Sequence, residues 1–88
     1  MEQVKQIEII LDLDINQVSE NELTEILYEA FKEKGYTPTD KPVVVREGKI
    51  SSVRAVKNDS QEEVELYAFA KVLKKGDKAK TYISARVV

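Results

Sequence analysis

The chain of 88 residues contains no cysteine, no histidine and no tryptophan, and only three glycines and two prolines. Without cysteine it can form no disulfide, no thiolate nucleophile and no zinc-ribbon or iron–sulfur site. Without histidine it also lacks the commonest metal ligand and the side chain that titrates closest to neutral pH. We therefore predict a protein that is not an enzyme and that uses no metal and no cofactor.

Long apolar stretches are missing as well. No run of apolar residues approaches the ~20 that a membrane-spanning helix needs. Residues Met1 to Lys5 carry no basic stretch followed by an uninterrupted apolar one, so no signal peptide is indicated. From the length and these absences we expect a single domain over residues 1–88, located in the cytoplasm and without a membrane partner.

The net charge of −2 is made of two halves of opposite sign. Residues 1–40 contain three bases and ten acids, a net charge of −7, and residues 41–88 contain eleven bases and six acids, a net charge of +5. An acidic helix and basic strands that are solvated and attract each other would explain this division. The alternative is a bipolar surface that steers a charged partner or a second copy of the chain.

One helix is indicated by a capping motif. Ser19 and Glu22 have the spacing of a capping box, in which each side chain can bond the backbone amide of the other residue. From Leu23 to Phe31 the apolar residues recur at helical spacing, and Gly35 supplies the residue that commonly ends a helix. The sequence therefore predicts a helix over residues 20–34.

The remaining segments alternate between apolar and polar residues with a period of two, which is typical of half-buried strands. Residues 36–42 contain both prolines and are expected to be a connector. The predicted strands are 4–13, 43–46, 49–57, 62–73 and 78–88. We therefore expect an α+β fold of order β-α-β-β-β-β, with one helix packed on a four- to five-stranded, mostly antiparallel sheet. The pattern does not place the first strand within that sheet.

The alternation also predicts which side chains share the face of the sheet away from the helix. Folding the chain about residues 58–61 places Ile50 opposite Phe69. Folding it about Lys75 and Gly76 places Phe69 opposite Tyr82, and a register two residues away keeps the same faces. The predicted surface consists of Ile50, Arg54, Glu65, Tyr67, Phe69, Tyr82 and Arg86.

Several roles are open for this surface. Aromatic residues favour strands in any case, so the face could simply be solvated. It could instead be a protein interface, most simply a two-fold homodimer in which the aromatic residues are buried and the charges orient the copies. A third role is a platform for single-stranded nucleic acid, with phosphates contacted by lysines of the last hairpin. These lysines are Lys71, Lys74, Lys75, Lys78 and Lys80.

The acidic outer face of the helix offers a further role, as an inhibitor or adaptor that binds a basic site on a larger protein. Its acids are Glu22, Glu25, Glu29 and Glu33. Weighing these roles, we expect a small protein-binding or assembly module that forms a homodimer through the outer face of the sheet.

Overall fold

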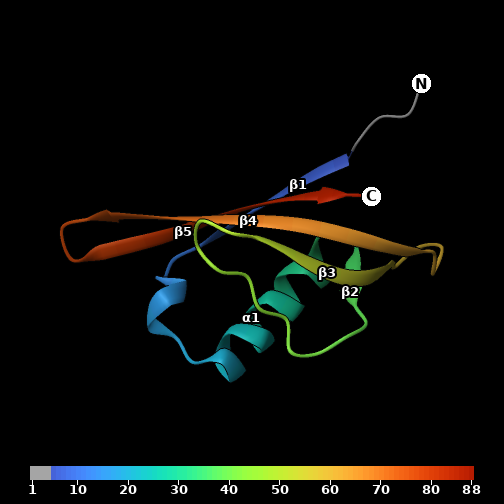
Figure 1. Ribbon diagram of the computed structural model, residues 1–88, viewed down its shortest axis with the longest axis horizontal. Helices are drawn as coiled ribbons and strands as arrows, with labels where there is room; N and C mark the ends of the chain where they lie inside the picture. The colour runs from blue at the N-terminus through green and yellow to red at the C-terminus, as the bar shows by residue number, and fades with distance from the viewer. Residues whose placement is uncertain (1–4) are drawn as a thin grey trace.

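The computed structural model describes residues 5–88, and it contains a single sheet with one long helix on one of its faces (Figure 1). The elements are β1 (Lys5–Leu11), the 3₁₀ helix η1 (Ile15–Gln17), α1 (Glu20–Glu33), β2 (Tyr36–Pro38), β3 (Ile50–Lys57), β4 (Glu63–Lys75) and β5 (Lys78–Val87). The strands are antiparallel and lie in the order β1-β5-β4-β3-β2. The predicted α+β class and element order are confirmed. Position 4 of the predicted first strand lies outside the described residues.

The helix begins and ends where its sequence signals predict. The Ser19 hydroxyl accepts a hydrogen bond from the Glu22 backbone N–H at 3.2 Å. At the other end, Gly35 has a φ of +99°, in the left-handed region that favours glycine. Between these ends, α1 buries Leu27 and Phe31 completely against the sheet.

The core lies between α1 and the inner face of the sheet. The central strands contribute small residues there, and Ala68, Ala70 and Ala85 have no exposed surface. Small side chains let the helix approach the sheet closely, so that Leu27 and Phe31 fill the space between the two layers. The core is therefore built from large residues on the helix and smaller ones on the sheet.

One predicted strand is wrong. We predicted a strand at residues 43–46 and a connector at 36–42, but the second strand is β2 (Tyr36–Pro38), which pairs with the end of β3. Val43 is held by the helix instead: its N–H donates to the Thr24 hydroxyl at 3.2 Å. Pro38 is tolerated because β2 is an edge strand, and on its open side no backbone N–H is needed for a hydrogen bond to a neighbouring strand. Val43 and Val45 point into the core without joining the sheet.

The register of β3 against β4 is as predicted, with Ile50 opposite Phe69. The sequence predicts a register of β4 against β5 with the turn at Lys75 and Gly76. The observed register is the alternative, shifted by two residues. The hairpin turns at Gly76 and Asp77, because Gly76 adopts a φ of +65°. Phe69 therefore lies opposite Ser84 and not opposite Tyr82, while all side chains keep their predicted faces.

Candidate interaction surface

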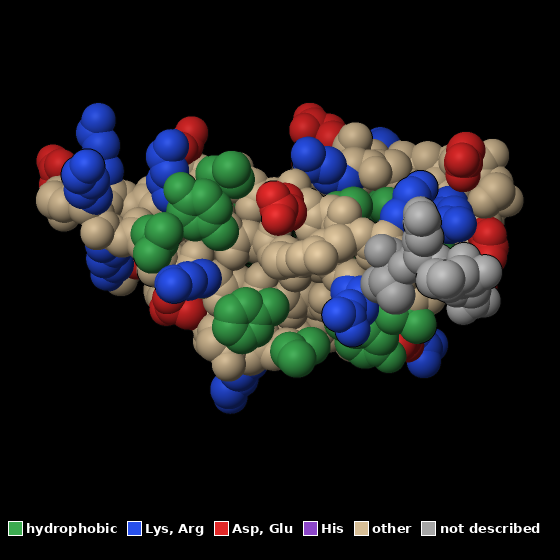
Figure 2. All heavy atoms as spheres, turned by 90° about the horizontal axis from the view of Figure 1, so that it is seen from above, with side chains coloured by type: hydrophobic (Ala, Val, Ile, Leu, Met, Phe, Trp, Pro, Cys, Tyr) green, Lys and Arg blue, Asp and Glu red, His purple; other side chains and the backbone are tan. Residues whose placement is uncertain are grey.

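The face of the sheet opposite α1, hereafter the outer face, carries a group of exposed hydrophobic side chains. All seven residues that the sequence predicts for this surface lie on it. Figure 2 looks onto this face and shows several groups of hydrophobic side chains, one of them toward the β4–β5 turn, with basic and acidic groups among them. The large hydrophobic residues and their exposed fractions are Ile10 60%, Ile50 73%, Tyr67 39%, Phe69 45%, Leu73 49% and Tyr82 39%.

Two of these residues were missed by the sequence prediction. Ile10 reaches the surface because β1 lies beside β5, where Ile10 is opposite Tyr82. Leu73 extends the row of Tyr67 and Phe69 along β4. A signal for both was present, since Ile10 shares its parity with the polar Gln6 and Glu8, and Leu73 shares its parity with Phe69. The apolar surface therefore spans β1, β5, β4 and β3.

The observed register places a cation beside each exposed tyrosine. Tyr67 lies directly opposite Arg86, and Tyr82 lies directly opposite Lys71. Directly opposed side chains on one face of a sheet are close enough to interact. The outer face is thus an alternation of aromatic and basic groups rather than a cluster of aromatic rings, and this is the main change that the corrected register brings.

Glu65 organises the polar end of this surface. It accepts a hydrogen bond from the Tyr67 hydroxyl at 2.5 Å, and its carboxylate lies 3.9 Å from the Arg54 Nε atom. The hydrogen bond to Glu65, followed by the negative charge of that carboxylate, raises the pKa of Tyr67 above its ordinary value. Tyr67 is therefore held as a neutral donor, and Arg54 lies beside an acid of its own chain.

The five lysines predicted as phosphate contacts lie along the β4–β5 hairpin, but they do not share one surface. Lys74 points to the helix side, where its Nζ atom is 3.3 Å from Asp14. Lys80 lies 3.6 Å from Asp12. Both ion pairs join a base of the second half of the sequence to an acid of the first half. Such pairs support the plainer explanation of the charge division, in which the two halves attract each other.

Asp14 fastens the segment after β1 beneath the hairpin. Its carboxylate accepts a hydrogen bond from the Asn16 N–H at 2.8 Å and is almost fully buried beside Lys74. The bond from Asn16 lowers the pKa of Asp14 below its ordinary value; burial acts in the opposite direction, and Lys74 adds to the lowering. Next to it, the buried Thr81 hydroxyl donates to the Leu13 carbonyl at 2.7 Å.

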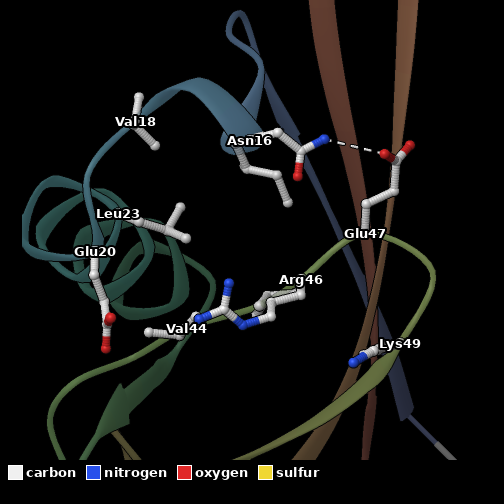
Figure 3. Close-up of a pocket in the computed structure, with 10 residues that line it drawn as sticks. Asn16, Val18, Glu20, Leu23, Val44, Arg46, Glu47 and Lys49 are labelled. Carbon is white, nitrogen blue, oxygen red and sulfur yellow. Dashed lines mark hydrogen bonds between the residues drawn. The ribbon is translucent and has the colours of Figure 1, made fainter.

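A hollow of about 430 Å³ lies between η1, the start of α1 and residues 44–49. Glu47 lies at its rim and accepts a hydrogen bond from the Asn16 side-chain amide at 3.1 Å (Figure 3). It accepts a second hydrogen bond from the Val72 N–H at 2.8 Å. The charged residues that line the hollow are two acids and two bases, Glu20, Glu47, Arg46 and Lys49. Because the charges balance, the hollow has no preference for a ligand of either sign. The two hydrogen bonds of Glu47 connect the segments around the hollow, so Glu47 has a structural role there.

Within residues 5–88, no group of three or more acidic, histidine or cysteine side chains is arranged to hold a metal ion. None of the helices in that range is long and apolar enough to cross a membrane. Comparisons of the chain with protein-family models, with curated proteins and with solved structures found no significant match.

Proposed function

We propose that this chain is a small, non-enzymatic assembly module that associates with a second copy of itself through the outer face of the sheet. The observation that carries the proposal is the grouping of six large hydrophobic residues, exposed by 39% to 73%, on that one face. Single apolar residues are normal on protein surfaces, but a contiguous group rimmed by charges is characteristic of an interaction site. The cytoplasmic location belongs to the same proposal.

The outer face is large enough for a stable dimer. Interfaces of standard size bury about 800 Å² on each partner. The two longest dimensions of the chain are 42 and 29 Å, and the sheet lies along the longer of them (Figure 1). A second sheet packed on this face would cover the hydrophobic residues, in the way that two sheets form a sandwich.

The arrangement of side chains suits a two-fold partner. Consider a two-fold axis that crosses the strands at Phe69, so that Phe69 of each copy meets its equivalent. This axis places Tyr67 over Lys71 of the second copy, and Arg86 over Tyr82 of the second copy. Each tyrosine then meets a cation, and such contacts are attractive when ring and cation are desolvated together. One chain can supply both members of each contact, as a two-fold interface requires.

The proposal is tested by the mass of the protein in solution before and after Phe69→Asp. At the same concentration the variant should have a lower mass than the wild type, because two facing carboxylates would be buried at the centre of the interface. Asn21→Asp is the matched control, since it adds the same charge at an exposed position of α1. Equal masses for wild type and Phe69→Asp, with both proteins folded by circular dichroism, would overturn the proposal.

Single-stranded nucleic acid is the second candidate, and the pairs of Tyr67 with Arg86 and of Tyr82 with Lys71 favour it. Stacking on aromatic rings beside cations is how such platforms bind bases and phosphates. The aliphatic residues Ile10, Ile50 and Leu73 give bases no ring to stack on, and for this reason a protein partner is preferred. Binding of a labelled oligonucleotide at low salt, weakened by Lys71→Ala and lost at high salt, would support the second candidate instead.

A further inference from the structure

Among the described residues, two stretches of unpaired strand edge are protected. The edge formed by β2 is only three residues long and contains Pro38, which has no N–H to offer. Beyond the start of β3, the loop residue Glu47 forms an isolated bridge with Ala70 of β4, and its carboxylate covers the Val72 N–H. Short length, proline and capping side chains are the devices by which proteins prevent edge-to-edge pairing.

The edge of β1 carries none of these devices. β1 is seven residues long, contains no proline or glycine, and within residues 5–88 has β5 as its one neighbour. Its charges, Lys5 and Glu8, cancel, and its remaining residues are rich in isoleucine and leucine. An apolar edge strand of low net charge is a template for pairing with another strand.

The side chains next to this edge are incompletely covered on both faces of the sheet. Ile7 and Leu11 are half-buried on the helix side, and Ile10 is 60% exposed on the outer face. A depression of about 430 Å³, lined by Gln6, Ile7, Glu8 and Lys34, lies along the edge. A strand added beside β1 would therefore bury apolar surface on both faces and pair the outward backbone groups of β1.

From these observations we infer that β1 is a second association site, at which the β1 strand of another copy pairs in antiparallel orientation to form a continuous ten-stranded sheet. A two-fold axis normal to the sheet keeps the helix-side faces of the two copies on the same side. Residues on the helix side of one copy therefore lie opposite residues on the helix side of the other. This inference concerns the edge of the sheet and does not depend on association through the outer face. Together the two sites would link copies into assemblies larger than a dimer.

The sequence of β1 selects one register for this pairing. An axis at Ile9 places Ile9 opposite its equivalent, Ile7 opposite Leu11 of the second copy, and Glu8 opposite Ile10 of the second copy. An axis at Glu8 would instead oppose two carboxylates, which is destabilising. An axis at Ile7 pairs the same number of β1 residues but places Lys5 opposite Ile9, so it makes fewer apolar contacts. The axis at Ile9 therefore combines the apolar contacts with the absence of opposed like charges.

Cysteine cross-linking tests this register, because the chain has no cysteine of its own. Single variants Glu8→Cys and Ile10→Cys are made in the Phe69→Asp background, which disables the outer face, and one of the two carries a terminal tag. In the proposed register the two cysteines lie on directly opposed residues, whose Cα atoms are about 4.5–5.5 Å apart, within the span of a disulfide. A mixture of the two variants should therefore give a mixed disulfide dimer in higher yield than either variant alone.

The matched control replaces Ile10→Cys with Ser52→Cys, an exposed position on the outer face of β3, far from β1. The proposal predicts a several-fold higher yield of mixed dimer for Glu8→Cys with Ile10→Cys than for this control. A yield equal to that of the control would overturn it, as would preferential cross-linking of Glu8→Cys to itself, which requires the axis at Glu8. Circular dichroism confirms that each variant is folded, and the Phe69→Asp background keeps a failure of the outer-face proposal from affecting the result.

Discussion

The carboxylate of Glu47 accepts a hydrogen bond from the backbone N–H of Val72 at 2.8 Å, just beyond the point where β3 begins to pair with β4. Glu47 also binds the side chain of Asn16. One side chain thus fastens the loop before β3 to η1 and covers the open side of β4. The contact caps a backbone N–H of β4 where this strand of 13 residues extends past β3.

Glu47→Ala should reduce the free energy of unfolding by about 1 kcal/mol, because a charged acceptor is lost from two hydrogen bonds at the surface. Chemical denaturation measures this loss, and Glu63→Ala, at an exposed position of β4, serves as the control. Hydrogen exchange of the Val72 amide should become faster in Glu47→Ala. An unchanged exchange rate at Val72 would show that Glu47 does not cap this strand.

The capping motif of α1 makes a separate prediction. Ser19→Ala removes the acceptor of the Glu22 N–H, so it should lower the free energy of unfolding by about 1 kcal/mol. Ser19→Asp keeps an acceptor at that position and should preserve most of the stability. Equal denaturation curves for Ser19→Ala and Ser19→Asp would contradict the role of the cap.

The buried Asp14 predicts a pH dependence of stability. Its pKa is lowered in the folded state, chiefly by the Asn16 N–H, so folding favours the ionised carboxylate. The contribution of Asp14 is therefore present above the pKa of the unfolded chain, about 3.9, and is lost as the pH falls through the lower folded value. Asp14→Asn keeps an acceptor for Asn16 but removes the charge, so it should melt at a lower temperature than the wild type at neutral pH.

This difference in melting temperature should shrink below about pH 4 as the wild-type carboxylate takes up its proton. Asp59→Asn, at an exposed turn position, provides the control and should show no such change. A difference between Asp14→Asn and the wild type that stays constant from neutral to acid pH would rule out the charge of Asp14 as its cause.

Tyr67 predicts the opposite pH behaviour. Its pKa is raised in the folded state by the hydrogen bond to Glu65, so its contribution to stability is present below the ordinary tyrosine value of about 10 and is lost as the pH rises through the folded value. Glu65→Gln should bring the titration of Tyr67 to lower pH. Tyrosinate absorbance followed with pH measures this, with Tyr67→Phe identifying its share of the signal. If Tyr67 titrates at the same pH in Glu65→Gln as in the wild type, the hydrogen bond to Glu65 is not what raises its pKa.

The sequence predicts the parts of this fold that are decided locally. The Ser19 cap and the alternation of β3 and β4 are local signals, and both predictions are confirmed. The predicted register of β4 against β5 differs from the observed one by two residues. Gly76 can be either the first or the second residue of a two-residue turn, and both registers keep the side chains on the same faces. The surface was incomplete because Ile10 joins it only once β1 is placed beside β5, which is a long-range contact.

β2 was missed for a related reason. Its proline appears in the sequence as a breaker, whereas an edge strand has one side on which N–H groups are not needed. The valines after Pro42 have a strong preference for strands, but tertiary contacts decide their conformation, since Thr24 of the helix bonds the backbone of Val43 on both its N–H and its carbonyl. At residues 43–46 the intrinsic preference for a strand is therefore overridden by tertiary contacts.

Sedimentation equilibrium of the wild-type protein over a micromolar concentration series tests the central claim most directly. If the outer face is an association surface, the measured mass should rise with concentration from that of the 10.0 kDa chain to at least twice that value. A mass that stays at that of one chain up to high micromolar concentration would contradict the claim, and the six exposed hydrophobic residues would then have to be explained without a second copy.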